Sequence, residues 1–96
     1  MKRLSSKLAL LDGEITHWCP GCKMLHRINV FNPNESTGAR WTWNNDQVHP
    51  SFAPSINIPG VCHYFINDGR IQFCNDSKHE YAGLTVAMPD IPGGEW

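Results

Sequence analysis

The stretch Cys19-Pro20-Gly21-Cys22 decides the fold that this sequence predicts. Two cysteines separated by two residues, with proline and glycine between them, form a tight turn that supplies half of a tetrahedral zinc site. The other half must come from the later part of the chain. That part offers four suitable side chains, Cys62, His63, Cys74 and His79. The sequence therefore predicts a fold that a zinc ion holds together.

Length and composition predict one small globular domain that spans residues 1–96. Of the 96 residues, 41% are hydrophobic and 18% are charged, which is typical of a globular chain rather than a disordered one. A chain of this size buries a modest core, and a bound metal is a common means of stabilising such a core. We expect the termini, 1–6 and 90–96, to be loose, since the second is rich in proline and glycine.

The charge and the apolar segments exclude several classes of function. The net charge is −1, so the chain lacks the basic surface that nucleic-acid binding requires. The apolar cluster at 8–11 is too short for a secretory signal, and no run approaches the roughly 20 residues of a membrane span. We therefore expect a cytoplasmic protein. In that reducing compartment, cysteines are metal ligands or free thiols rather than disulfides.

Turn signals predict a mainly β fold of antiparallel hairpins around a zinc-ribbon-like knuckle. Asp-Gly pairs at 12–13 and 68–69 favour type I′ turns, because both central residues of such a turn need positive φ. Segment 44–60 contains Pro50, Pro54 and Pro59, which argue against both a helix and a central strand, so we expect an ordered loop there. The expected strands are 7–11, 14–18, 24–30, 40–44, 61–66, 70–74 and 84–88.

The second expected hairpin places its side chains on two faces. With Asp68-Gly69 as the turn, Tyr64 faces Phe73 and His63 faces Cys74. Side chains alternate along a strand, so one face is apolar and should point to the core. This apolar face carries Cys62, Tyr64, Ile66, Ile71 and Phe73, and the opposite face carries His63, Phe65, Gln72 and Cys74.

Two completions of the zinc site follow from this arrangement. In the first, which we favour, Cys62 and His79 join Cys19 and Cys22. In the second, the cross-strand neighbours His63 and Cys74 complete it, since facing residues have Cβ atoms about 4.5–5.5 Å apart. Asp76 is a candidate for the carboxylate that orients a ligating histidine. We interpret His17 and His49 as surface or loop residues, and His26 as a polar residue on a half-exposed strand.

Several longer motifs occur in a fixed order along the chain. They are His17-Trp18-Cys19-Pro20-Gly21-Cys22, Trp41-Thr42-Trp43-Asn44, Pro50-Ser51-Phe52-Ala53-Pro54-Ser55-Ile56, and Cys62-His63-Tyr64-Phe65-Ile66-Asn67-Asp68-Gly69, followed by Asp76 and His79. In this order the chain resembles a family of small phage and bacterial proteins that are often mislabelled "ammonia monooxygenase". That label does not fit, because the enzyme of that name is a membrane complex.

The resemblance implies a zinc-binding β domain that is frequent in phage genomes. Some cellular relatives look to be encoded beside ubiquitin-like conjugation genes, which suits an adaptor. One departure concerns Ser77, because in the family pattern a cysteine often stands two residues before the histidine that matches His79. If that cysteine is a ligand, this chain has either moved the ligand to Cys74 or replaced it with a histidine.

Two hypotheses for the function differ in class. The first, which we favour, is a module that binds and modulates a host or cellular protein, with Trp41, Trp43 and Phe52 near the proline-rich segment as the binding surface. The alternative is a metal-dependent hydrolase with an open zinc position, in which His63 and Asp76 supply the chemistry and Asp46 or Ser55 assists. No His-Glu-x-x-His motif supports the alternative.

Overall fold

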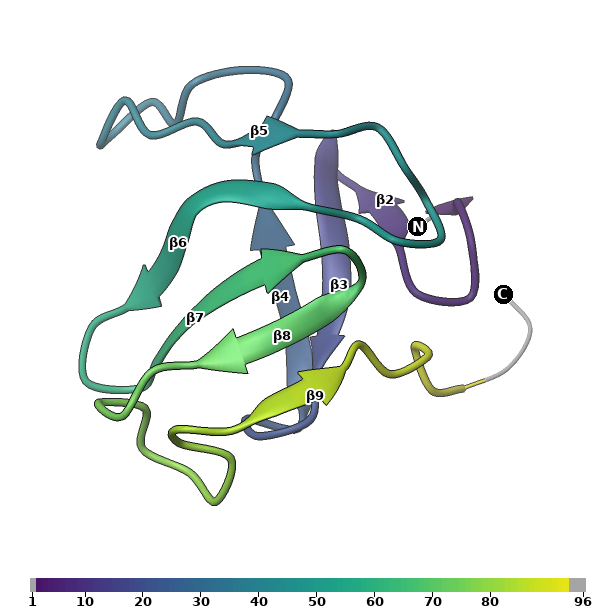
Figure 1. The fold of residues 1–96 in the computed structure, drawn as a ribbon. Helices are drawn as coiled ribbons and strands as arrows, with labels where there is room; N and C mark the ends of the chain where they lie inside the picture. Colours follow the sequence, from purple (N-terminus) through teal and green to yellow (C-terminus); the bar gives the residue numbers. More distant parts are fainter. Residues whose placement is uncertain (1, 94–96) are drawn as a thin grey trace.

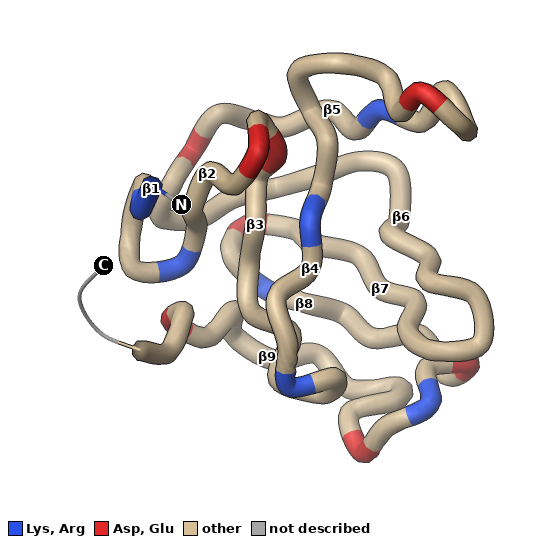
Figure 2. Tube along the Cα trace, turned by 180° about the vertical axis from the view of Figure 1, so that it is seen from behind, with Lys and Arg blue, Asp and Glu red and all other residues tan. Residues whose placement is uncertain are grey.

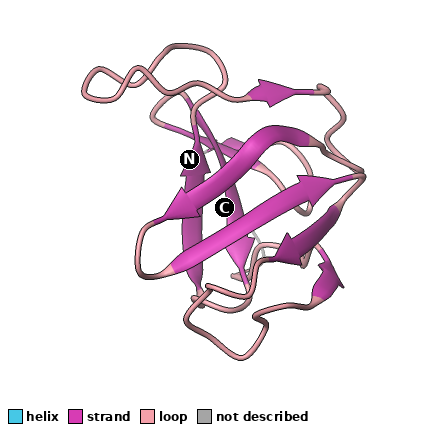
Figure 3. Ribbon diagram, turned by 60° about the vertical axis from the view of Figure 1, so that its left-hand side comes forward, coloured by secondary structure: helices cyan, strands magenta, loops and turns pink. Residues whose placement is uncertain are grey.

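Two antiparallel β-sheets face each other in the computed structural model, which describes residues 2–93 (Figure 1). The first sheet has the strand order β1-β2-β3-β4, and the second has the order β5-β6-β7-β8-β9. These elements and their connecting loops make up the described chain (Figure 3). The strands are β1 (Lys2–Arg3), β2 (Ala9–Leu11), β3 (Glu14–Cys19), β4 (Met24–Ile28), β5 (Thr42–Trp43), β6 (Phe52–Ile58), β7 (Cys62–Asn67), β8 (Arg70–Phe73) and β9 (Thr85–Ala87).

The mainly β fold of antiparallel hairpins is confirmed. At both Asp-Gly turns the two central residues have positive φ, 51° and 79° at Asp12 and Gly13, and 50° and 73° at Asp68 and Gly69. The predicted register of β7 against β8 is also confirmed, with Tyr64 opposite Phe73. Over residues 2–93, no helix reaches the length and hydrophobicity that a transmembrane segment needs.

The prediction that 44–60 is a loop was wrong, because this segment contains β6, a strand between β5 and β7. The pairing of β6 with β7 is irregular between Phe52 and Ile56, and β5 pairs only with Phe52 and Ala53. Pro54 lies within this irregularity, after a cis Ala53–Pro54 bond. A residue without an N–H is tolerated at such a bulge because no ladder hydrogen bond is required there.

The core fills the space between the two sheets, whose strands run across one another (Figure 1). β7 shows how the pattern positions it, since its residues alternate between buried and more exposed along its length. Two cysteines of the metal-site motifs, Cys19 and Cys62, belong to this core. The other buried members are Leu8, Ile15, Ile28, Phe52, Ile56, Tyr64, Ile66, Ile71, Phe73 and Met88.

Two histidines also lie inside, which corrects the interpretation of His17 as a surface or loop residue and of His26 as half-exposed. Their exposed fractions are 0% and 5%. The hydroxyl of Tyr64 lies between them, 2.7 Å from His17 Nε2 and 3.0 Å from His26 Nδ1. This network joins β3 and β4 of the first sheet to β7 of the second. His49 is exposed.

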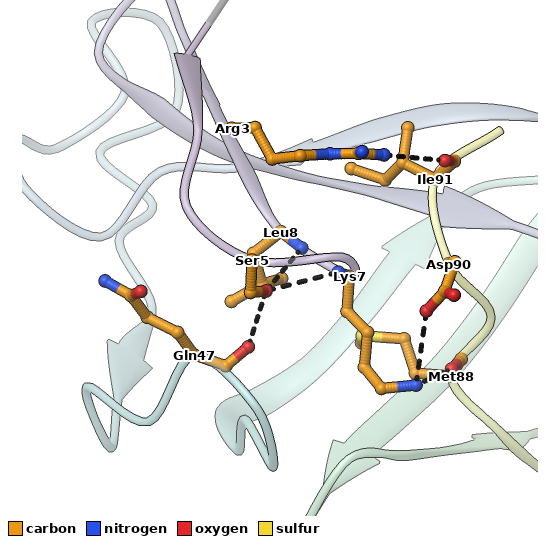
Figure 4. A network of polar contacts seen from close by, with 8 residues as sticks. All are labelled: Arg3, Ser5, Lys7, Leu8, Gln47, Met88, Asp90 and Ile91. Atoms are coloured by element: carbon orange, nitrogen blue, oxygen red, sulfur yellow. Dashed lines mark hydrogen bonds and ion pairs between the residues drawn. The ribbon is translucent and has the colours of Figure 1, made fainter. Parts of the chain in front are cut away.

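The described parts of the two termini contact each other and the adjoining chain, and the looseness that we expected for 1–6 and 90–96 stays a prediction. A guanidinium nitrogen of Arg3 donates to the carbonyl of Ile91 at 2.9 Å, and Lys7 Nζ donates to the carbonyl of Met88 at 2.6 Å (Figure 4). Ile91 is also buried. Residue 1 and residues 94–96 lie outside the described part of the chain.

Candidate functional site

The turn after β3 folds the two N-terminal cysteines toward each other. The N–H of Lys23 donates to the carbonyl of Cys19 at 2.8 Å, and Lys23 adopts a φ of 56°, which closes the turn. The N–H of Cys22 donates to the sulfur of Cys19 at 3.3 Å. This contact holds Cys22 against the Cys19 sulfur and closes the knuckle.

Cys62 and His79 approach the same point from the second sheet. The ligand atoms of Cys19, Cys22, Cys62 and His79 all lie within 4.8 Å of one another, and we call these residues the four-residue metal site. Cys62 Sγ is 3.3 Å from His79 Nε2. The site therefore joins the β3–β4 turn to the start of β7 and to the loop that follows β8. The four residues are those of the completion that the sequence analysis favoured.

Gly21 makes room for the His79 ring. A Cβ atom at this position would overlap the His79 ring, whose atoms Cε1, Nδ1 and Nε2 are the three nearest to it. The histidine therefore lies directly on the glycine of the turn. Only a residue without a side chain permits this approach.

The electrostatics of this cluster call for a cation. Burial and the neighbouring Cys19 and Cys22 thiols raise the pKa of Cys62. Burial and Cys19 also raise the pKa of Cys22. The thiols of Cys22 and Cys62 therefore resist ionisation, and a divalent ion bound among the sulfurs would stabilise their thiolate forms. The residues fit a tetrahedral metal ion in number, spacing and donor type.

The alternative ligands His63 and Cys74 are not part of that site. His63 follows Cys62 on β7, and successive side chains of a strand point to opposite faces. The ligand atoms of His63, Cys74 and Asp76 instead lie within 4.8 Å of one another and form a second group. The structure thus separates two sets of residues that the sequence analysis offered as alternatives for one site.

His63 also lies between Ser55 and Asp76 and contacts both side chains. Its Nε2 lies 3.1 Å from Ser55 Oγ, and its Nδ1 lies 3.2 Å from Asp76 Oδ2 and 3.3 Å from Oδ1. A carboxylate accepts hydrogen bonds, so Nδ1 carries the proton and Nε2 is free to accept the serine hydrogen. This is the geometry of a nucleophile, a base and a group that orients the base. We call Ser55, His63 and Asp76 the triad.

Local backbone contacts position the members of the triad. The hydroxyl of Ser77 accepts the His63 N–H at 3.0 Å and donates to the His63 carbonyl at 2.9 Å, so that the loop carrying Asp76 is fixed to β7. The indole N–H of Trp41 donates to the carbonyl of Ser55 at 3.2 Å and fixes β6 at this residue. The side chains of His63 and Asp76 are 26% and 64% exposed, so the site is open to solvent.

The aromatic residues predicted to bind a partner have different environments. Phe52 is only 3% exposed and belongs to the core, while Trp43 stacks on it at a centroid distance of 6.1 Å. Trp41 and Trp43 are half-buried. Asp46, considered as an assisting residue, instead accepts the N–H groups of Val48 and His49 at 2.8 Å each, and these bonds lower its pKa. It therefore stabilises a turn.

Sequence reasoning named all three triad residues but did not join them. Ser55 was considered only as an assistant to a metal-dependent reaction, because it was assigned to a loop. Its place on β6, opposite β7, brings it to His63, since the strand pairing sets Asn57, two residues after Ser55, opposite His63. The sequence feature that could have joined them is a serine and a histidine eight residues apart on two consecutive strands. Without the register of those strands, this spacing does not predict that the two side chains meet.

The charged residues are distributed along the chain. The Lys and Arg residues and the Asp and Glu residues lie at separate places scattered over the tube (Figure 2). Arg27, for example, lies 3.5 Å from Asp12 and 3.7 Å from Glu14. The charge of Arg27 on β4 is therefore partly neutralised by these two carboxylates.

The chain belongs to the family described as the bacterial ubiquitination-like system serine protease (BubE), whose sequence model matches residues 3–74. That description mentions a bacterial system and makes no reference to zinc or to phages. The matched range includes Ser55 and His63, whereas Asp76 and His79 lie just beyond it. Neither the comparison with curated proteins nor that with solved structures gave a match.

Proposed function

We propose that this protein is a serine hydrolase that cleaves a peptide bond of a protein belonging to a bacterial ubiquitination-like system. One observation carries the proposal: Ser55 Oγ, the His63 ring and the Asp76 carboxylate form a continuous chain of contacts of 3.1 and 3.2 Å. The name of the family supports the choice of a peptide bond and of the system in which the substrate occurs.

The triad assigns each residue a role in acyl transfer. Ser55 Oγ attacks the carbonyl carbon, and His63 Nε2 takes its proton. Asp76 holds the Nδ1 proton, fixes the orientation of the ring and stabilises the imidazolium that forms. His63 then gives the proton to the leaving amine. In the second half of the reaction, His63 takes a proton from water, the water oxygen attacks the acyl group, and His63 returns the proton to Ser55 Oγ as the acyl group leaves.

The edge of β6 beside Ser55 suits an extended peptide. The N–H and carbonyl of His63 bond to Ser77 and Cys74, on the β8 side. The pair Asn57 and His63 is therefore a non-hydrogen-bonded one, and the backbone groups of Asn57 point to the opposite edge. β5 pairs only with the first residues of β6 and does not reach this part. A substrate strand can add here by main-chain hydrogen bonds.

We assign the four-residue metal site to zinc with a structural role. Three sulfurs and one imidazole nitrogen are a typical donor set for Zn²⁺, and four protein ligands leave no open position for a reacting water. When bound, the ion would hold the β3–β4 turn to β7. The metal-dependent hydrolase considered from the sequence therefore finds less support than a serine mechanism.

The protein-binding function predicted from the sequence is compatible with this proposal. A protein substrate is itself a protein partner, and Trp41 and Trp43 flank the edge of β6 on which it would bind. The phage origin and the cytoplasmic location stay predictions.

The test is covalent labelling of Ser55 with a fluorophosphonate probe, followed by peptide mass spectrometry. The wild-type protein should be labelled at Ser55, and both Ser55→Ala and His63→Ala should lose labelling while remaining folded. Ser36→Ala is a matched control, because Ser36 is an exposed loop serine. A folded, metal-loaded protein that is not labelled, or one labelled equally in Ser55→Ala, would refute the proposal.

A further inference from the structure

Cys74 lies beside the triad and has no part in acyl transfer. It is the one cysteine outside the four-residue metal site, and its N–H donates to the His63 carbonyl at 2.8 Å. Its sulfur, a ligand nitrogen of His63 and a carboxylate oxygen of Asp76 lie within 4.8 Å of one another. Three different metal-binding groups thus converge here, although a serine hydrolase needs only the imidazole and the carboxylate.

We propose that His63, Cys74 and Asp76 form a second zinc site, and that zinc bound there inhibits the hydrolase. The inhibitory effect rests on the proposed function, whereas binding of the ion does not. The site would make the enzyme responsive to the concentration of free zinc.

The donors and their exposure suit a reversible zinc ion. A thiolate, an imidazole and a carboxylate are all ordinary zinc ligands. Asp76 is 64% exposed and Cys74 is partly exposed, so an ion can arrive from solvent without opening the fold. Three protein ligands leave the fourth position to water. We therefore expect weaker binding here than at the four-residue metal site, and exchange without loss of structure.

A cation also relieves an unfavourable neighbourhood. Partial burial and the Asp76 carboxylate raise the pKa of the Cys74 thiol. A divalent ion between the two groups would offset this repulsion, and the thiol proton would leave to solvent as the sulfur–metal bond forms.

Inhibition follows from the two nitrogens of one ring. His63 Nδ1 faces Asp76 at 3.2 Å, so an ion that joins these residues takes Nδ1. A neutral imidazole carries a single proton, which must then reside on Nε2. Nε2 would point an N–H at Ser55 and could no longer accept the serine proton. Zinc would thus remove the general base without displacing any residue.

The first experiment measures labelling of Ser55 by the fluorophosphonate probe as free zinc is raised, with the four-residue metal site already loaded. We expect zinc to suppress labelling in the wild type. Cys74→Ser should keep basal labelling and need at least about tenfold more zinc for half-inhibition, since losing even an outer-shell partner of a zinc site costs 10–100-fold in affinity. His49→Gln, which removes an exposed histidine elsewhere, should behave as the wild type.

The second experiment detects the ion without activity. Cobalt added to the zinc-loaded protein should give a thiolate-to-metal absorption in the near ultraviolet for the wild type and not for Cys74→Ser. Equal zinc inhibition of the wild type and Cys74→Ser, or no cobalt–thiolate signal, would overturn the proposal. Activation by zinc would also overturn it and favour a metal-dependent hydrolase. If Ser55 is not labelled at all, the proposed function fails, yet the cobalt signal still decides whether the site exists.

Discussion

The side chain of Ser77 and the backbone of His63 exchange two hydrogen bonds, in which the Ser77 hydroxyl accepts the His63 N–H at 3.0 Å and donates to its carbonyl at 2.9 Å. Ser77 thereby takes the place of a paired residue on a neighbouring strand. The loop after β8 is fixed to β7 by this contact and by the N–H of Lys78, which donates to the Val61 carbonyl at 2.9 Å. Asp76 therefore reaches His63 from a loop that is fixed to β7 and the residue before it through the two residues that follow Asp76.

Ser77→Ala should destabilise the protein and reduce the labelling rate of Ser55. It leaves the partly buried N–H of His63 without a partner, which costs about 1–3 kcal/mol, and it frees the loop that carries Asp76. Urea denaturation and the rate of fluorophosphonate labelling measure the two effects. Ser36→Ala should change the stability by less than about 0.5 kcal/mol. Unchanged stability and labelling in Ser77→Ala would show that the loop is held by other contacts.

Trp41→Phe should slow the reaction of Ser55 with little change in the fold. The substitution removes the N–H that Trp41 donates to the Ser55 carbonyl while keeping an aromatic ring. The loss of one such bond is worth about 1 kcal/mol, or roughly fivefold in rate if it acts on the nucleophile alone. Trp43→Phe is the matched control, because the Trp43 indole donates to the Asp46 carbonyl instead. Equal effects of the two substitutions on labelling would contradict a positioning role for Trp41.

Gly21→Ala should displace His79 and weaken metal binding. The added methyl group would occupy the space of the His79 ring. Metal affinity, measured by competition with a chelator, should fall by at least about tenfold, as for the loss of a partner at a zinc site. A double-mutant cycle with His79→Ala isolates the cause, since Gly21→Ala should cost little once the ring is absent. Additive effects of the two substitutions would mean that the glycine acts through something other than His79.

Cys22→Ser and Cys74→Ser should differ sharply in stability. Structural zinc contributes about 10–16 kcal/mol in small zinc domains, which is comparable to the whole stability of a protein of this size. We therefore expect Cys22→Ser to be unfolded or aggregated, and a strong chelator to unfold the wild type. Cys74→Ser should keep the wild-type melting temperature within a few degrees. Circular dichroism with elemental analysis tests this, and a folded, metal-free Cys22→Ser protein would argue against a structural ion.

Tyr64→Phe should lower the free energy of unfolding by about 1–3 kcal/mol, because it leaves two buried histidine nitrogens without a partner. His17 Nδ1 lies 3.3 Å from a carbonyl, so its Nε2 accepts the Tyr64 hydrogen, and the Tyr64 oxygen accepts from His26 Nδ1. Tyr81→Phe is the control, since its hydroxyl makes no hydrogen bond within residues 2–93. A loss no larger than that of Tyr81→Phe would show that the network adds nothing to stability.

The hairpins could be predicted from the sequence because their turns are local. Asp-Gly needs only its own two residues to adopt positive φ, and the register of β7 against β8 follows from the turn. The same register places Cys62 inward and His63 outward, so the four residues of the metal site could be proposed. These inferences needed no knowledge of how distant segments pair.

The triad and β6 could not be predicted, because both depend on irregular pairing. Pro54 argues against a central strand, and only the bulge between Phe52 and Ile56 makes that strand possible. Without β6, Ser55 has no defined relation to His63. The burial of His17 depends on the Tyr64 hydroxyl from the other sheet, a contact that no local pattern reveals.

Cys62 and His63 are consecutive residues, one directed at the four-residue metal site and the other at Ser55. Asp76 and His79 repeat this division on a single loop. Removing an ion from the four-residue metal site would therefore disturb His63 through its peptide bond to Cys62. It would disturb Asp76 through the short loop that ends at His79. Under the proposed serine mechanism, treatment with EDTA should abolish turnover, as it does for a metalloprotease, although the metal would hold the fold and take no part in the reaction. Classification of the proposed hydrolase therefore has to rest on which atom becomes acylated.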